Sequence, residues 1–502
     1  MRLFLYAFLI LLLLTNFSAA QNRNNVWCFG DSAAIDFSSG NPVPSISSLD
    51  TRGTCVAISD TSSNLLFYCN TRAATAGFTG LIWNRNHLLM LEGDSIAGSG
   101  WYHEMVIIPN PIDDSLFYVF CIGVTNSYGL LYSIVDMRGD NGLGEVIQKN
   151  ISLLNNIRMV DCLTAIKHGN GRDWWVITRP SPVQQPSYNN LWYSYLVTPS
   201  GISSISIQNS GTLNSSNIGA LSFFEINSKL CFTNANGLIE LYDFDRCTGT
   251  ISNSLNIEVQ AILPPYPVYW SNEFSPNGRY LYVSGSTTPS TLWQFDTWAP
   301  NIDSTKTLIW QTSYPPYTAG ALKRGPDNKI YFSCAWSDSS GNFNYPYPDS
   351  AFYLENMNLS VINAPDSAGT ACDFQPWSFY LGGKRTYWGL PNNPDYDLGP
   401  LVGSPCDSLT SISEIPVFSE AEFFVYYESN WQTTFINANK LKGTKYHLEV
   451  FDLLGKSIFR ESGKVSSPYF TKNLNCSGFS KGMYVVNFVT DKERLTKRFV
   501  VR

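Results

Sequence analysis

Three short motifs in this 502-residue chain place a potential nucleophile or phosphate-binding group in a glycine-containing turn. Phe29–Ser32 reads Phe-Gly-Asp-Ser, but a serine nucleophile needs a histidine base that an aspartate orients, and no histidine here has an aspartate three residues before it. Gly478–Gly482 matches Gly-x-Ser-x-Gly, yet a strand pattern and no histidine follow it. Leu454–Ser457 lacks the first glycine of a phosphate-binding loop, because that position is Val450. None of the three predicts catalysis.

Metal-ligating residues are equally sparse. Asp243–Gly249 offers spaced carboxylates of the kind that suit calcium. The corresponding segments end in Asp136 and Asp296, each before a turn, so an aspartate that closes a hairpin is the simpler interpretation. The chain has only 4 histidines and no Cys-x-x-Cys pair, which disfavours zinc. We therefore predict no metal site and no cofactor.

A polar turn followed by a short aromatic and β-branched run recurs at intervals of about 50 residues, which is the pattern of a repeat protein built from small sheets. A second strand-like run follows most copies. No segment has convincing helical periodicity, so alternating strands and helices are disfavoured. The six copies are Asp60–Cys69, Ile112–Cys121, Gly169–Thr178, Ile226–Ala235, Ser275–Gly285 and Gly325–Ala335.

The repeat predicts an all-β fold, a seven-bladed β-propeller over residues 25–392, with six or eight blades as alternatives. Six repeats are complete, and we expect the N-terminal fragment near residues 26–40 to join the C-terminal fragment near residues 370–383 in a seventh blade. Residues 393–419 are rich in Pro, Gly, Asp and Ser and are expected to form a linker. Residues 420–502 alternate like a small Ig-like antiparallel β-sandwich of six or seven strands.

The loops before the innermost strands carry clustered aromatic residues and prolines, and we expect them to ring one mouth of the central channel. Aromatic faces stack on sugars or peptide side chains, and prolines reduce the entropy lost in holding a loop open. The same rings could instead pack between blades. The predicted ligand-binding residues are Trp101, Tyr102, His103, Tyr266, Tyr269, Trp270, Tyr317 and Trp377.

The N-terminus predicts export. Arg2 precedes an apolar run with small residues at Ser18 and Ala20, as in a secretory signal peptide over residues 1–20; a membrane anchor is the alternative, but the run is short for one. The net charge of −7 argues against nucleic acid as a partner. Disulfides are possible outside the cytoplasm. Among the 11 cysteines, the pairs close enough in sequence to suspect are Cys55–Cys69 and Cys231–Cys247.

The end of the chain resembles the type A C-terminal sorting domain of Bacteroidota type IX secretion. The resemblance rests on "LEVFDLLGKSIFRES" and "FSKGMYVVNFVTDKERLTKRFVVR". The family usually opens with Tyr-Pro-Asn-Pro, where this chain has Val425–Trp431, so the start of the domain is less well defined than its end. The resemblance implies recognition by the type IX machinery; an ordinary accessory β-domain is the alternative. The sorting-signal residues it implies are Gly455, Lys456, Lys481, Gly482, Tyr484, Lys497 and Arg498.

The front of the chain, through segments such as "WCFGDSAAIDFSSG" and "EFSPNGRYLYVSG", resembles secreted Bacteroidota WD-repeat-like propeller proteins. We therefore expect a secreted or cell-surface protein with no membrane span once the signal peptide is removed. The leading hypothesis is a non-catalytic propeller that binds a glycan or a protein. The alternative is a secreted hydrolase or lyase that acts on polysaccharide at the channel mouth.

Overall fold

The computed structural model describes residues 22–72, 78–182, 188–261, 267–286, 289–312, 317–338, 340–341, 343–407, 421–452, 456–465, 467–490, 492 and 494–501. The expected signal peptide lies outside these residues. The chain divides into two compact units, Met1–Thr410 and Ser411–Arg502, and each is described by itself. In the described ranges, no helical segment has the length and apolarity to span a bilayer.

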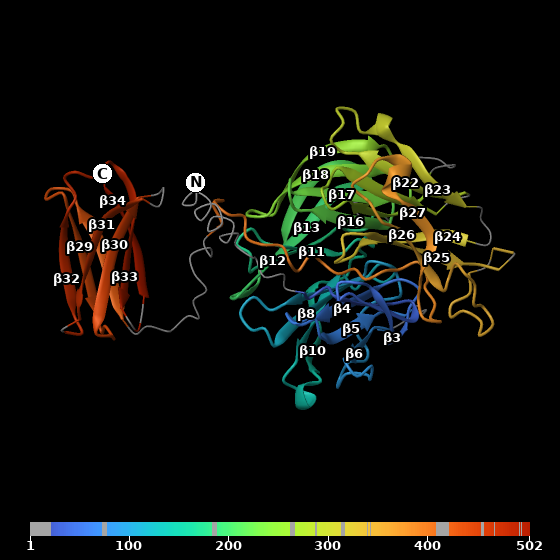
Figure 1. The fold of residues 1–502 in the computed structure, drawn as a ribbon, viewed down its shortest axis with the longest axis horizontal. Coiled ribbons are helices and arrows are strands. Elements are labelled where there is room, and N and C mark those ends of the chain that lie inside the picture. The colour runs from blue at the N-terminus through green and yellow to red at the C-terminus, as the bar shows by residue number, and fades with distance from the viewer. Residues whose placement is uncertain are drawn as a thin grey trace, which may run out of the picture. The chain divides into compact units, whose positions relative to one another are not determined.

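The first unit contains seven antiparallel sheets in its described residues, each built from strands that are consecutive in the chain (Figure 1). We call them blades 1 to 7. They are β1–β3 (Val26–Phe29, Asp31–Asp36, Val43–Asp50), β4–β6 (Cys55–Ser59, Leu65–Asn70, Leu81–Asn84), β7–β10 (Met105–Pro109, Leu116–Ile122, Leu130–Asp136, Glu145–Leu154), β11–β15 (Thr164–Lys167, Trp174–Thr178, Asn189–Thr198, Gly201–Ile202, Ser206–Asn214), β16–β19 (Gly219–Phe224, Lys229–Asn234, Ile239–Asp245, Thr250–Glu258), β20–β23 (Tyr269–Phe274, Tyr280–Gly285, Ser290–Asp296, Thr307–Thr312) and β24–β27 (Tyr317–Arg324, Ile330–Trp336, Asn358–Ile362, Phe374–Tyr380).

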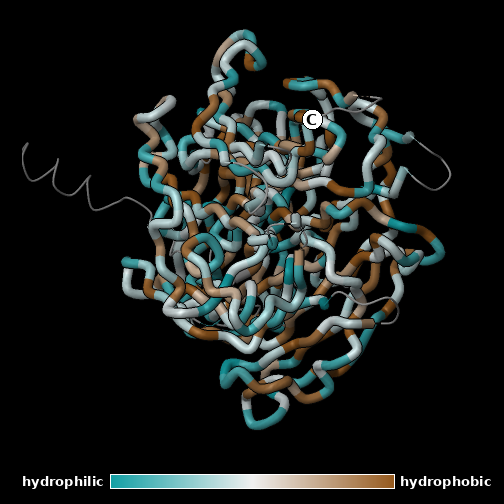
Figure 2. The backbone as a smooth tube through the Cα atoms, turned by 90° about the vertical axis from the view of Figure 1, so that its right-hand side faces the viewer, coloured by the Kyte–Doolittle hydropathy of each residue, from teal (hydrophilic) through white to brown (hydrophobic). Residues whose placement is uncertain are grey.

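The first strand of each blade contacts the first strand of the next blade, from β1 and β4 through to β20 and β24. These strands form an inner ring around a channel, and every residue of β4 and of β7 is buried. Hydrophobic segments, brown in Figure 2, run through the body of this unit. A sheet this small cannot cover both of its faces alone, so each blade is stabilised by its neighbours. The unit is a seven-bladed β-propeller, as predicted.

The ring closes differently from our expectation. Blade 1 consists entirely of N-terminal strands, and β27 is the outer strand of blade 7, so no blade combines the two ends of the chain. The prediction failed because residues 337–357 separate β25 from β26 and displace β27 beyond the regular repeat. Blades 1 and 7 instead pack directly, with the rings of Trp27 and Tyr331 edge to face at 5.6 Å.

A non-repetitive segment follows blade 7, residues 385–407, which we call the strap. It begins beside blade 1, where the Asp31 N–H donates to Arg385 O at 2.8 Å and the two side chains form an ion pair at 2.6 Å. It ends at blade 4, where the Leu401 N–H donates to Gly169 O at 2.8 Å. Residues 393–407, expected to belong to a linker, therefore pack against the propeller because their polar groups find partners there.

One disulfide joins the strap to blade 5, between Cys247 and Cys406. The two cysteine pairs suspected from sequence proximity are wrong. Cys55, Cys69 and Cys231 are free thiols buried in strands, where cysteine packs as a small apolar side chain. The partner of Cys247 lies 159 residues away in sequence, so local spacing could not reveal it.

The second unit is a sandwich of two antiparallel sheets. One has the order β28-β29-β32 (Glu422–Glu428, Thr433–Asn439, Phe470–Asn475), and the other has the order β31-β30-β33-β34 (Ser457–Lys464, Lys445–Asp452, Gly482–Thr490, Arg494–Val501). Alternate residues such as Ile436, Leu448, Val486 and Phe488 point inward and are fully buried. This agrees with the predicted Ig-like sandwich of six or seven strands.

Candidate functional site

One end of the propeller channel is closed by three aromatic rings, which we call the cap. Tyr102 precedes β7 in blade 3, Trp270 lies in β20 of blade 6, and Trp388 belongs to the strap. The Tyr102 ring centroid lies 4.4 Å from that of Trp270 and 6.2 Å from that of Trp388. Because blades 3 and 6 stand across the ring from each other, contact between their rings seals this end.

Two buried carboxylates hold the loop that carries Tyr102. Glu104 accepts the backbone N–H groups of Ser99, Gly100 and Trp101 at 2.9–3.1 Å. Asp161 accepts those of Tyr102 at 3.0 Å and of His103 at 2.7 Å. Burial raises the pKa of both carboxyls, and the negative charge of Glu104 raises that of Asp161 further. Their oxygens are occupied by backbone donors, so they position the cap.

The eight predicted ligand-binding residues do not form one ring. Trp101, Tyr102 and Trp270 gather at the cap, where Trp101 lies 6.2 Å from Tyr102. The other aromatic side chains pack within and between blades, and Tyr266 lies outside the described residues. Those packed side chains are Tyr269, which donates to Glu258, and Tyr317 and Trp377, whose rings lie 5.8 Å apart.

The strap runs along the channel and bonds to the inner strands of three blades. The Ala57 N–H of β4 donates to Asn393 Oδ1 at 3.0 Å. Asn392 Nδ2 donates to the carbonyl oxygens of Met105 at 2.9 Å and Leu163 at 2.8 Å. Further along, the Tyr396 hydroxyl donates to Ile107 O at 2.8 Å. The strap therefore fills one side of the channel and forms a wall of whatever space remains.

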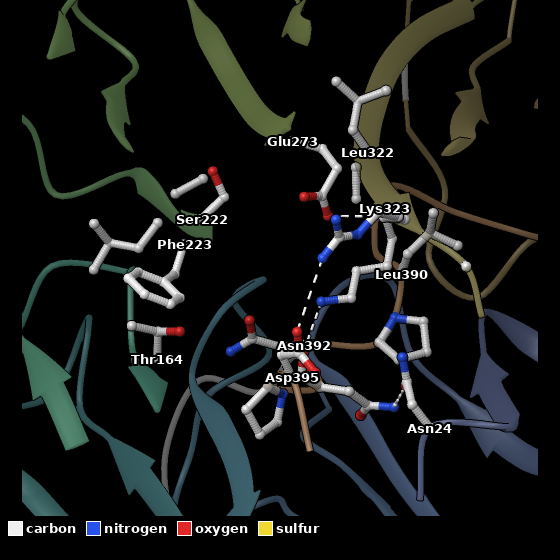
Figure 3. Close-up of a pocket in the computed structure, with 18 of the residues that line it drawn as sticks. Asn24, Thr164, Ser222, Phe223, Glu273, Leu322, Lys323, Leu390, Asn392 and Asp395 are labelled. Atoms are coloured by element: carbon white, nitrogen blue, oxygen red, sulfur yellow. Dashed lines mark hydrogen bonds and ion pairs between the residues drawn. The ribbon is translucent and has the colours of Figure 1, made fainter. Parts of the chain in front are cut away.

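That space is a cavity of about 300 Å³ between the strap and the inner strands of blades 4 to 7 (Figure 3). It reaches from His103 near the cap to the turns that follow β16, β20 and β24, where Glu225, Pro276 and Asn328 line it. It therefore opens on the face opposite the cap. Figure 3 shows Thr164 and Phe223 on one side of the cavity and Lys323 and Glu273 on the other.

Charged groups of both signs line the cavity. Arg324 Nη2 lies 3.6 Å from a carboxylate oxygen of Glu225 and 3.9 Å from one of Asp395. Lys323 Nζ donates to the Asn393 carbonyl oxygen of the strap at 2.7 Å. Burial lowers the pKa of Lys323, an effect that the nearby Glu273 carboxylate opposes. The cavity wall thus presents adjacent hydrogen-bond donors and acceptors.

Of the predicted residues that the structure describes, His103 alone lines this cavity. Its Nδ1 atom is buried without a hydrogen-bond partner among the described residues. Burial, aided by the positive charge of Lys323, lowers the pKa of His103 to about 4. The imidazole is therefore neutral at physiological pH and brings no charge to the cavity wall.

The lowered pKa of His103 predicts a loss of stability in acid. An unfolded histidine binds a proton near pH 6.5, whereas the folded one does so only near 4, so between these values the unfolded state holds more protons. The free energy of unfolding should fall by at most about 3 kcal/mol from this residue as pH drops through that window. Urea denaturation of the wild type and His103→Gln at pH 7, 5.5 and 4.5 measures the difference; parallel profiles would contradict it.

Sequence reasoning missed most of the cavity. Lys323 and Arg324 come at the end of the otherwise apolar β24, and that charged pair at the end of an inner strand was the available signal. Asp395 falls in the segment expected to form a linker, residues 393–419, and Asn392 is the last residue of the expected propeller. No local pattern indicates that the strap returns to the channel.

The residues of the expected sorting signal divide between surface and core. Lys456, Lys481, Gly482, Lys497 and Arg498 are exposed. Tyr484 is buried, and its ring stacks on that of Phe499 at 5.5 Å, so it stabilises the sandwich. Gly455 lies outside the described residues. The last strand, β34, thus presents two basic side chains at the surface, those of Lys497 and Arg498.

These features define a class of protein, a β-propeller followed by a separate β-sandwich. Residues 431–502 match the family described as the secretion system C-terminal sorting domain. This is the sorting domain of type IX secretion, which places the mature protein outside the cell or on its outer surface. The match begins after β28, which nevertheless pairs with β29 along its whole length.

Similar solved structures are also propellers, at low similarity. Periplasmic gluconolactonase PpgL from Pseudomonas aeruginosa is 10% identical with a TM-score of 0.37, covering 81% of this chain and 99% of that one. A putative 6-phosphogluconolactonase from Bacteroides fragilis is 10% identical with a TM-score of 0.34, covering 66% and 99%. The Cps50 (Swd1) propeller domain from Myceliophteria thermophila is 9% identical with a TM-score of 0.33, covering 62% and 92%. Among curated proteins, none matches the chain.

Proposed function

We propose that this protein is a non-catalytic glycan-binding propeller, exported by type IX secretion, and that the channel cavity is its ligand site. The observation that supports this most is the composition of the cavity wall. The cavity has a volume of about 300 Å³, at the small end of ligand sites, and its wall combines one aromatic face with convergent polar groups.

A sugar ring matches both the polar groups and the aromatic face of the cavity wall. Its hydroxyls each donate and accept hydrogen bonds, so they pair well with a wall where Arg324 lies beside Glu225 and Asp395. Its C–H face packs on an aromatic ring, and Phe223 offers one across the cavity. A protein partner at the cap is less well supported, because Tyr102, Trp270 and Trp388 already pack on one another.

The test is glycan-array screening of the full exported protein, followed by calorimetry with the glycans that bind. We expect Phe223→Ala and Asp395→Asn each to weaken binding about tenfold, the loss of one good contact worth roughly 1.4 kcal/mol. Asp395→Asn keeps the shape of the side chain, which guards against misfolding. The matched control is Tyr380→Ala, an exposed aromatic residue at the end of β27 outside the cavity lining.

Two results would contradict the proposal. If no glycan binds, or if the cavity variants bind like the Tyr380→Ala control, the cavity is not a glycan site. If the bound glycan is instead cut with multiple turnovers, and Asp395→Asn abolishes the cutting, the protein is a hydrolase or lyase rather than a binding protein.

A further inference from the structure

We infer that the cavity recognises the end of a glycan chain, one neutral sugar unit, rather than an internal stretch. This inference rests on the proposed function and specifies its ligand. It depends on three observations: the channel has one open end, the remaining space is small, and the basic groups around it already lie near carboxylates.

The channel is blind because the cap and the strap close it together. Beneath the rings of Tyr102, Trp270 and Trp388, Asn392 bonds to the inner strands of both blade 3 and blade 4. Leu390 and Pro391 of the strap line the cavity, as does His103. A polysaccharide therefore cannot thread through the propeller, and a unit that enters from the open face must be the last of its chain.

The size of the cavity limits what enters. A cavity volume of about 300 Å³ lies at the small end of ligand sites, so we expect it to hold one sugar ring rather than several. The turns that carry Glu225, Pro276 and Asn328 bound the opening. The second sugar unit would lie at these turns, with the rest of the chain in solvent.

The charges of the lining favour a neutral sugar. Four carboxylate side chains line the cavity, those of Glu225, Glu273, Asp395 and Asp397, against the two basic side chains of Lys323 and Arg324. His103 adds no charge, because its imidazole is neutral at physiological pH. Two further cations, Lys167 and Arg246, lie close enough to Asp395 to interact with its charge, so four basic side chains balance the four carboxylates. Each of these basic groups already lies near a carboxylate, so the carboxylate of a uronic acid would lose its water in the site without gaining a cation of its own.

The first experiment measures binding of single units to the full exported protein by calorimetry. The probes are the methyl glycosides of glucose, galactose, mannose, N-acetylglucosamine and fucose, together with glucuronate and galacturonate. We expect one or more neutral glycosides to bind at least tenfold more tightly than the acidic sugars. Binding of oligosaccharides on the array with no binding of any single unit would overturn the inference but leave the proposed function standing.

The second experiment compares chains with and without ends. For the sugar that binds, a linear oligosaccharide and a cyclic one of the same linkage and length are titrated against the protein, as with maltohexaose and α-cyclodextrin for glucose. We expect the linear probe to bind at least tenfold more tightly. Equal affinities would show internal recognition and overturn the inference alone, whereas binding of neither probe, with none on the array, would overturn the proposed function too.

Two variants locate the bound unit. Thr164→Trp adds bulk to the cavity wall and should remove binding of the linear probe, with Asp395→Asn as the milder check if the larger side chain impairs folding. Phe343→Ala alters the opposite face, where that ring lies 4.6 Å from Trp388 at the cap, and should leave affinity unchanged. A loss with Phe343→Ala and none with the cavity variants would place the ligand at the cap and overturn the inference.

Discussion

Removal of residues 421–502 is expected to abolish appearance of the protein outside the cell, while the propeller itself stays folded. The sandwich is a separate compact unit with its own core, so its loss breaks no packing within the propeller. The sorting domain is the part of the chain that the type IX machinery handles. In the native host, immunoblots of periplasm, cell surface and medium should show the truncated protein in the periplasm and only background outside.

Point variants separate recognition from folding in the same assay. Replacing Lys497 and Arg498, both exposed on β34, by glutamate should reduce export without unfolding the sandwich. Lys464→Glu on β31 is the matched control for a reversed surface charge, because Lys464 is exposed on the same sheet outside the last hairpin. Undiminished export of the truncated protein would contradict the sorting role; equal effects of all charge reversals would contradict the role of the hairpin.

Loss of the Cys247–Cys406 disulfide is expected to destabilise the propeller by about 2–5 kcal/mol, because the bond closes a long loop and limits the freedom of the unfolded chain. The bond also fixes the end of the strap, which forms a wall of the cavity. Cys247→Ser should therefore lower the midpoint of thermal unfolding by roughly 3–6 °C. Differential scanning calorimetry of the oxidised protein measures this shift.

Two comparisons make this result specific to the cross-link. Cys406→Ser and the double variant should show the same loss as Cys247→Ser, because each removes the same bond and the effects are not additive. Cys372→Ser changes a buried free thiol in blade 7 and reports the effect of replacing a cysteine that forms no disulfide. Additive losses in the double variant, or a midpoint equal to the wild type, would show that the disulfide contributes no stability.

Much of the architecture could be predicted because it is encoded locally. Polar turns and apolar runs alternate in Ser275–Gly285 and its copies, and each copy forms the turn and second strand of one blade, as in β20–β21. The sandwich could be predicted for the same reason, since only four residues of sequence separate β30 from β31, and these two strands pair with each other. The closure of the ring could not be predicted, because the insertion between Trp336 and Asn358 lengthens blade 7. Its last strand therefore falls outside the regular spacing of the repeat.

The candidate site, in contrast, could be predicted from the sequence only in small part. The aromatic residues before the inner strands were identifiable, but their spacing does not reveal that Tyr102 and Trp270 touch across the ring and close it. The cavity depends on the strap, where Asn392 and Asn393 bond to strands more than 200 residues away in sequence. Contacts between residues so far apart in sequence produce no periodic pattern from which they could be predicted.

The sequence by itself determined the blade repeat, the terminal sandwich and the export route, because each depends on residues that are neighbours along the chain: alternating strand faces, turns, and a terminal motif. Only the tertiary structure decided which end of the channel is open, which side chains line it and which cysteines pair. These depend on where the strap lies once the ring is closed, and on which polar groups of the inner strands remain available to bond with it.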